Sequence, residues 1–199
     1  MQKQITDLLA MRKGHFLLES GHHGELWLDL ELLCWNPIRL KPIVTELTKR
    51  ISKYNVEMIC SPLVEGAFVG LMAALELNLE FVYTERFIPS NGDNLFPAEY
   101  RLPEVLHEKI RGKRVAVIND VINAGSAVRG TFSELHAYSA NPVCVGTLMM
   151  LGDVFVEYAE NNKIAIETLA MQPNPIWKPK ECPLCVSDVP LEDVGGFQL

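Results

Sequence analysis

The sequence has no long apolar run, no excess of positive charge and no regular framework of cysteines. No stretch approaches the roughly 18 apolar residues of a membrane-spanning helix, and residues 1–13 lack the apolar core of a signal peptide. The 25 acidic residues outnumber the 18 basic ones, and the net charge of −7 argues against non-specific binding to nucleic acid or to anionic membranes. We therefore expect a cytoplasmic protein without a nucleic-acid or membrane partner.

The five cysteines are odd in number and unevenly spaced, so a disulfide framework is a poor interpretation. Cys182 and Cys185 form a C-x-x-C pair, which is compatible with plain reduced thiols, with a redox pair or with zinc ligands. Because structural zinc takes four protein ligands, a zinc site here would be completed by a second subunit, with two cysteines from each chain. The adjacent His22 and His23 are a poor chelating pair, and contact with substrate or a partner subunit is the better interpretation. The remaining histidines are expected to be ordinary surface or helix residues: His15, His107 and His136.

The alternation of apolar runs with helical segments indicates an α/β fold. The 199 residues, 48% hydrophobic and 22% charged, fit one globular domain with a small appendage. Apolar runs typical of buried strands lie at residues 56–60, 80–84, 114–119, 142–149 and 164–169. Helical segments separate most of them, at residues 66–77, 103–110, 126–140 and 153–161. Strands that are apolar throughout and alternate with helices predict a parallel sheet covered on both faces.

The N-terminal part departs from this alternation. We expect a helix over residues 2–13 that stops at Gly14, followed by a hairpin whose strands HFLLES and ELWLDLE flank the turn-like SGHHGE. Asn36 and Pro37 carry the N-cap and first-position signals of a further helix, which we expect to run to about Tyr54.

Two irregular segments complete the chain. Residues 86–102 are rich in proline, glycine and asparagine and have no helical period, so we expect a loop that covers a site. The end of the chain is rich in proline and carries the C-x-x-C pair. We therefore divide the chain into a domain over residues 1–171, with a hood over roughly 1–54, and an irregular C-terminal arm over 172–199.

Residues able to do chemistry gather where the third apolar run ends, within RVAVINDVINAGSAVRGTF. The run ends in Asn119 and Asp120, and a turn with Gly125 then leads into a helix. In a parallel sheet, ligands bind beyond the carboxyl ends of the strands, where such a turn offers backbone N–H groups and a helix N-terminus to an anion. A phosphate cradle beside a carboxylate suits a phosphorylated sugar, although any parallel-sheet protein has turns of this kind.

This segment resembles the phosphoribosyl-pyrophosphate (PRPP) signature of the type I phosphoribosyltransferases, in which four apolar residues precede two acids, a V-I pair and a short Thr/Gly-rich loop. The chain has VAVI, then N-D, V-I and NAGSA. Two other segments resemble the orotate branch of the family: GHFLLESGHHGELWLDLE its N-terminal hairpin, and ICSPLVEGAFVGLMAALE its pyrophosphate loop and following helix. The resemblance covers roughly Gly14 to Met150. It implies a five-stranded parallel core sheet flanked by helices, with a small N-terminal hood.

The resemblance also implies a function and the residues that perform it. A homodimer would transfer ribose 5-phosphate from PRPP to a nitrogen base with the help of Mg²⁺, most readily in pyrimidine nucleotide synthesis. Catalytic roles fall to Asp120 and Asn119, and phosphate clamps to Arg86 and Arg101. The loop for the 5′-phosphate comprises Asn123, Ala124, Gly125, Ser126 and Ala127. The loop for the pyrophosphate comprises Ser61, Pro62, Leu63, Val64, Glu65 and Gly66.

Departures from the family pattern leave the acceptor base open. Asn119 replaces the first acid of the usual pair; it accepts hydrogen bonds but brings no charge to a metal. The phosphate loop has a single hydroxyl group, that of Ser126, and residues 87–102 contain no lysine or histidine. A PRPP-binding or regulatory protein with weakened catalysis is therefore the alternative. A methyltransferase-like enzyme is disfavoured, because ICSPLVEGAF stands where a G-x-G-x-x-G would follow the first core strand.

Overall fold

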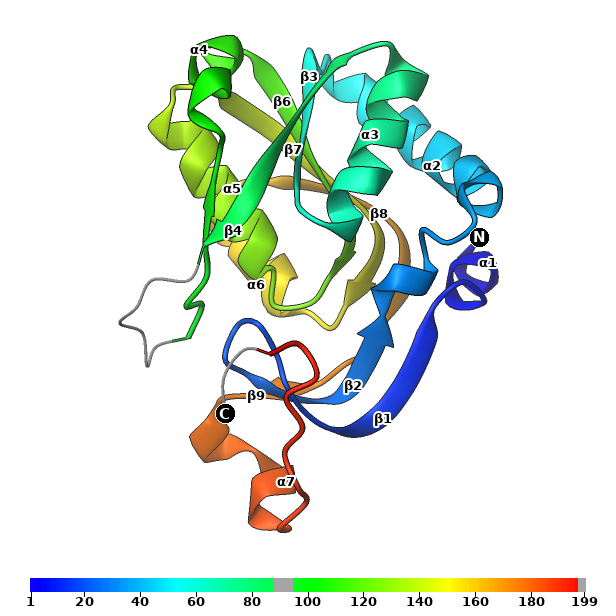
Figure 1. The fold of residues 1–199 in the computed structure, drawn as a ribbon, viewed down its shortest axis with the longest axis vertical. Coiled ribbons are helices and arrows are strands. Elements are labelled where there is room, and N and C mark those ends of the chain that lie inside the picture. Colours follow the sequence, from blue (N-terminus) through cyan, green and yellow to red (C-terminus); the bar gives the residue numbers. More distant parts are fainter. Residues whose placement is uncertain (88–94, 197–199) are drawn as a thin grey trace.

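A six-stranded sheet forms the core of the protein, whose computed structural model describes residues 1–87 and 95–196 (Figure 1). Its strands are β3 (Met58–Pro62), β4 (Glu80–Phe87), β5 (Glu99–Arg101), β6 (Arg114–Ile122), β7 (Asn141–Leu151) and β8 (Ala165–Gln172). The strand order is β5-β4-β3-β6-β7-β8. All neighbours pair in parallel except β5, which runs antiparallel to β4 at the edge. The predicted five-stranded parallel core is confirmed.

Helices cover both faces of this sheet, as the apolar runs predicted. Two main helices lie on each face: α2 (Pro37–Ile51) and α3 (Glu65–Leu77) on one, α5 (Ser126–Ala137) and α6 (Val154–Asn161) on the other (Figure 1). Alternate residues of β6 join opposite apolar clusters, Ile118 the first and Val117 the second. Because both faces of β6 are buried, its position and register in the sheet are fixed by packing.

The start of α2 follows its sequence signal. The side chain of Asn36 accepts a hydrogen bond from the backbone N–H of Arg39 at 3.3 Å, and Pro37 occupies the first helical position. The helix ends at Ile51, and a short 3-10 turn, η2 (Ser52–Tyr54), follows it. The prediction of a helix from Asn36 to about Tyr54 is confirmed.

The hood is a second, three-stranded antiparallel sheet below the core sheet in Figure 1. It comprises β1 (Ala10–Leu17), β2 (His23–Asp29) and β9 (Ile176–Trp177), after a short helix α1 (Gln2–Thr6) and before a 3-10 turn η1 (Leu30–Leu32). The predicted hairpin is confirmed, but the helix over residues 2–13 is wrong beyond Thr6. The chain becomes a strand at Ala10 because it pairs with Asp29 of β2, and Gly14 lies inside β1, where the pairing register shifts.

The C-terminal arm is less irregular than predicted, because it adds β9 to the hood. Beyond β9 it forms a 3-10 turn, η4 (Pro179–Glu181), and a one-turn helix, α7 (Pro183–Val186). It then returns to the outer side of β1: the backbone N–H of Leu17 donates to the carbonyl of Glu192 at 2.9 Å, and the N–H of Glu192 donates to the carbonyl of His15 at 2.8 Å.

The long connection predicted after Arg86 is shortened at both ends by the β4–β5 hairpin. Strand β4 extends to Phe87, and β5 returns at Glu99. Residues 88–94, the middle of the expected covering loop, lie outside the described residues. The helix expected at 103–110 is a 3-10 turn, η3 (Glu104–Leu106), followed by α4 (His107–Ile110). Within the described part of the chain, no helix is long and apolar enough to span a membrane.

Candidate active site

A cavity of about 850 Å³ lies between the carboxyl ends of the core strands and the hood. Its floor is the end of β6 and the loop that follows. The β3–α3 loop, the end of β4 and the β1–β2 hairpin form its walls. Most of the site residues predicted from the sequence line this cavity, although they come from segments more than 60 positions apart.

Asp120 lies in the cavity with its carboxyl group buried and its pKa strongly raised. It is only 3% exposed, and its Oδ2 atom has no hydrogen-bond partner in the described structure. Burial raises the pKa of this carboxyl group from 3.8 to about 7, and the nearby charge of Glu65 adds to the shift. The hydroxyl of Thr147 donates to the backbone carbonyl of Asp120 at 2.8 Å and holds the strand in place. An unpaired, buried acceptor that faces a cavity is typical of a functional site.

Asn119 turns its amide group back onto the chain. Its Nδ2 donates to the carbonyl of Val121 at 2.8 Å. A Cβ atom on Gly66 would overlap the Oδ1 atom of Asn119, so the start of α3 packs directly against this side chain. Glycine at position 66 therefore permits the close approach of α3 to β6 that shapes the cavity.

All five residues of the Asn123–Ala127 loop, where the phosphate cradle was predicted, line the cavity. Gly125 has φ = 81°, a left-handed conformation that favours glycine, and a Cβ atom there would overlap the ring of Phe155. Helix α5 begins at the next residue, so its N-terminal N–H groups are presented at the loop. Asn123 Oδ1 is buried without a hydrogen-bond partner among the described residues.

All residues of the predicted pyrophosphate loop except the first, Ser61, line the cavity. Residues 62–66 line the cavity, with Glu65 in the first turn of α3. Ser61 does not line it: this residue is fully buried, and a Cβ atom on Gly70 would overlap its hydroxyl oxygen. Ser61 therefore lies against α3, behind the wall of the cavity.

The two candidate phosphate clamps have different surroundings. Arg86 lines the cavity, and its Nε lies 3.7 Å from Oε2 of Glu19. Arg101 lies outside the cavity lining: it donates to Glu99 at 2.8 Å and stacks over the ring of Phe87, 3.9 Å from its centroid. The structure thus brings Arg86, but not Arg101, to the site.

Sequence reasoning missed the contribution of the hairpin tip. Glu19 lines the cavity and accepts a hydrogen bond from the hydroxyl of Tyr100 at 2.8 Å, and burial raises its pKa. Trp27 also lines the cavity, and its Nε1 donates to Asp29 at 3.0 Å. Nothing in the local sequence marks Glu19, because its partner Tyr100 lies 81 positions away.

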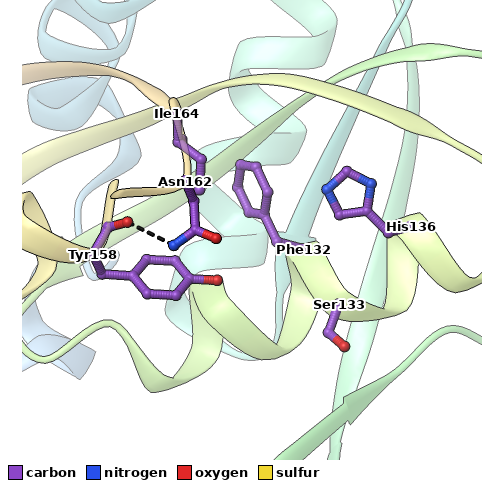
Figure 2. Close-up of a pocket in the computed structure, with 6 residues that line it drawn as sticks. All are labelled: Phe132, Ser133, His136, Tyr158, Asn162 and Ile164. Atoms are coloured by element: carbon purple, nitrogen blue, oxygen red, sulfur yellow. Dashed lines mark hydrogen bonds between the residues drawn. The ribbon is translucent and has the colours of Figure 1, made fainter. Parts of the chain in front are cut away.

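A second, smaller cavity of about 290 Å³ lies between α5 and α6 (Figure 2), and Asp120 is not among its lining residues. Its lining consists of Phe132, Ser133, His136, Tyr158, Asn162 and Ile164. The amide of Asn162 donates to the carbonyl of Tyr158 at 2.8 Å and closes the α6 C-terminus (Figure 2). This cavity has no carboxylate and no loop of backbone N–H groups, so it offers no comparable chemistry.

A group of histidine and cysteine side chains lies outside both cavities. His15 was expected to be an ordinary surface or helix residue, but it is 1% exposed in β1. His23, expected in the hairpin turn, begins β2. Both rings meet the C-x-x-C pair of the C-terminal arm, Cys182 and Cys185.

Similarity to known proteins agrees with this geometry, although no family model matches the chain. The orotate phosphoribosyltransferase of Thermotoga maritima is 28% identical over 197 residues, which cover 98% of each chain. The adenine phosphoribosyltransferase of Trypanosoma brucei, in complex with AMP, pyrophosphate and ribose-5-phosphate, has a TM-score of 0.67 at 16% identity, over 85% of this chain and 78% of that one. The orotate phosphoribosyltransferase of Aeropyrum pernix has a TM-score of 0.61 at 17% identity, over 85% and 89%. The chain is thus similar to orotate phosphoribosyltransferases over almost its whole length, and it has the fold of the type I phosphoribosyltransferases.

Proposed function

We propose that the protein transfers ribose 5-phosphate from PRPP to a nitrogen base, with orotate as the acceptor that the names of its relatives indicate. The reaction would serve pyrimidine nucleotide synthesis. The observation that carries the proposal is the placement of a buried, unpaired carboxylate, Asp120, beside a glycine turn at a helix N-terminus, in a cavity of about 850 Å³.

The cavity offers a group of suitable chemistry to each part of PRPP. The N–H groups of the Asn123–Ala127 loop and of the α5 N-terminus suit the 5′-phosphate. Asp120 accepts hydrogen bonds from the ribose hydroxyl groups, which would supply the missing partner of its Oδ2 atom. The loop at residues 62–66 faces the pyrophosphate, and Arg86 offers a guanidinium group to phosphate oxygens.

The transfer breaks the bond between the anomeric carbon and a pyrophosphate oxygen, and the base nitrogen forms the new bond. Positive charge develops on the sugar, and negative charge on the leaving group. Asp120, once deprotonated by substrate binding, lies where it stabilises the sugar cation, while loop N–H groups and Arg86 stabilise the leaving group. The hood closes the cavity opposite the sheet and limits the access of water to the cation.

Mg²⁺, which the fold family implies, fits the residues present. The orphaned Oδ2 atom of Asp120 and the carboxylate of Glu65 belong to one cavity, and Mg²⁺ in phosphate sites prefers one or two carboxylates together with substrate oxygens. The ion would neutralise charge on the pyrophosphate. Asn119 is neutral and its amide is bonded to the backbone, so it contributes no charge to this site.

The proposed enzyme is a cytoplasmic homodimer. Phe68, Leu71 and Leu75 follow one another at helical spacing along α3 and are 48%, 46% and 75% exposed. An exposed apolar stripe along one helix favours a protein interface, and a second copy of the chain would bury it. Sedimentation of the wild-type protein and of Leu75→Glu tests this: the variant should shift toward the monomer.

A PRPP-binding protein with weakened catalysis is the second candidate, and Asn119 is the observation that favours it. The replaced acid leaves Asp120 as the only carboxylate of the signature, and the Asn119 amide is already bonded to Val121. Such a protein would bind Mg²⁺-PRPP through the same cavity but release pyrophosphate slowly.

Pyrophosphate release from Mg²⁺-PRPP, measured with orotate, uracil and adenine in turn, tests the proposal. We expect release with orotate and none for Asp120→Ala. Tight calorimetric binding of PRPP without release in the presence of any base would favour the binding protein, and in that case Asn119→Asp should increase the rate. Absence of both binding and release would reject both candidates.

A further inference from the structure

Four side chains with metal-binding atoms meet where the hood joins the C-terminal arm. They are His15 in β1, His23 in β2, Cys182 after η4, and Cys185 in α7. One ligand atom from each lies within 4.8 Å of all the others. We infer that these four side chains bind one Zn²⁺ ion, which fixes the C-terminal arm to the hood within a single chain.

The distances between the ligand atoms are close to the edges of a zinc tetrahedron. Zinc–nitrogen bonds of about 2.1 Å and zinc–sulfur bonds of about 2.3 Å give tetrahedron edges of roughly 3.3–3.8 Å. His15 Nε2 lies 3.0 Å from His23 Nδ1, 3.4 Å from Cys182 Sγ and 3.7 Å from Cys185 Sγ. Cys185 Sγ lies 3.2 Å from His23 Nδ1. Small relaxation would centre a metal ion among the four atoms.

Hydrogen bonding alone does not account for the contacts of His15. Its other ring nitrogen, Nδ1, lies 2.7 Å from the carbonyl of Val189, which only accepts, so Nδ1 carries the proton. In the neutral ring, Nε2 then has one lone pair, yet three ligand atoms crowd around it. A single cation would bind this lone pair together with the three neighbouring ligand atoms. The bond to Val189 is the kind of outer contact that orients a histidine ligand.

Apart from backbone pairing with the hood, the C-terminal arm has little to hold it in place. Among residues 173–196, only Asn174 and Cys182 are buried, so the arm has no apolar core of its own. Short segments without a core are commonly fixed by disulfides or by a structural metal. Both cysteines are free in the structure, which leaves the metal as the fitting device.

The donor set also indicates which metal is bound. Two thiolates and two imidazoles in a closed tetrahedral arrangement are typical of structural zinc, and they disfavour Mg²⁺, which prefers oxygen ligands. Because His15 and His23 complete the set, the chain needs no cysteines from a second subunit, contrary to the arrangement expected from the C-x-x-C pair alone. Both thiols would release their protons to solvent when the metal binds.

Metal analysis of untagged protein, expressed in zinc-supplemented medium and dialysed without chelator, tests the inference. We expect about one zinc per chain, whatever the oligomeric state. Cys182→Ser and His15→Asn should each lose the zinc. Two matched controls outside the group, Cys34→Ser and His136→Asn, should retain it.

Three outcomes would overturn the inference. One zinc per two chains would place the site between subunits, and a Cys182–Cys185 disulfide found by mass spectrometry of native protein would make the pair a redox couple. Protein without zinc that also fails to take up added Zn²⁺ in competition with a chromogenic chelator would exclude a metal. If Cys182→Ser does not fold, uptake of Co²⁺ by the wild-type protein still decides, because thiolate-bound tetrahedral Co²⁺ has a distinctive visible spectrum.

Discussion

The core sheet and the hood face each other across one cavity, but they are stabilised in different ways. On the core side, Asp120 and the Gly125 turn continue a strand buried on both faces by apolar clusters. On the hood side, the strand that carries His15 and the C-terminal arm are joined by backbone hydrogen bonds and by the histidine–cysteine group. Asp120 and the glycine turn thus lie on the well-packed core side, which we call the rigid side. The hood, which covers the cavity, depends on polar or metal-centred contacts for its attachment to the C-terminal arm.

This difference separates two kinds of variant. Changes on the core side that leave the apolar clusters intact should abolish activity without unfolding the chain. Changes at the attachment of the arm should loosen the cover first and should affect the chemistry only through it.

The largest effect is expected from Asp120→Ala. Ribose hydroxyl groups left without their buried acceptor lose about 1–3 kcal/mol each, so we expect PRPP binding and transfer to fall at least ~100-fold. Calorimetry of PRPP binding and the pyrophosphate assay measure this, with the exposed Asp7→Ala as a matched control and thermal unfolding as a check on the fold. Unchanged affinity in a folded Asp120→Ala protein would remove this residue from the site.

The pH dependence of stability provides a second test of the rigid side. In the native protein Asp120 keeps its proton up to about pH 7, whereas in the unfolded chain it ionises near its ordinary pKa of 3.8. A raised native pKa stabilises the fold at low pH, and this stabilisation is lost as the pH rises from about 4 through 7. Relative to Asp120→Asn, the wild-type free energy of unfolding should therefore decrease over this range, by at most about 4 kcal/mol.

Denaturant unfolding of both proteins in magnesium-free buffer, at several pH values, measures this difference. Parallel pH profiles would show that Asp120 titrates as an ordinary, solvated carboxyl group. Addition of Mg²⁺-PRPP should flatten the profile, because a bound substrate favours the ionised carboxylate.

The hood side is tested by removing the metal. If zinc fixes the arm, a zinc-selective chelator should speed trypsin cleavage after the exposed Lys180 about tenfold, because local opening becomes the main route to cleavage. Cys182→Ser should be cleaved at the fast rate with or without chelator, and Cys34→Ser should behave as wild type. Equal cleavage rates in all samples would mean that backbone pairing alone holds the arm.

The sequence predicted the core side well because its signals are local. Apolar runs, the Asn36–Pro37 cap and the glycine turn at 125 each specify structure within a few residues. The first helix failed beyond Thr6 because pairing with Asp29, a non-local contact, overrode a weak helical pattern. The hood side was not predictable in the same way: His15 and Cys182 are 167 positions apart, and no short pattern reports that they meet.

The smallest effects should separate the two candidate clamps. Arg86 lines the cavity and pairs with Glu19, whereas Arg101 lies outside its lining and pairs with Glu99. Arg86→Ala removes a charged hydrogen-bond donor near phosphate, for which about 1.5–3 kcal/mol is typical, so KM for PRPP should rise at least ~10-fold.

Arg101→Ala should change KM less than about twofold, because this side chain lies outside the cavity lining and its exposed ion pair with Glu99 does not touch the site. Initial rates at varied PRPP concentration measure both effects. A rise in KM for Arg101→Ala as large as that for Arg86→Ala would mean that the β4–β5 hairpin brings Arg101 onto the substrate when PRPP binds, and the clamp would then come from both strands of the hairpin.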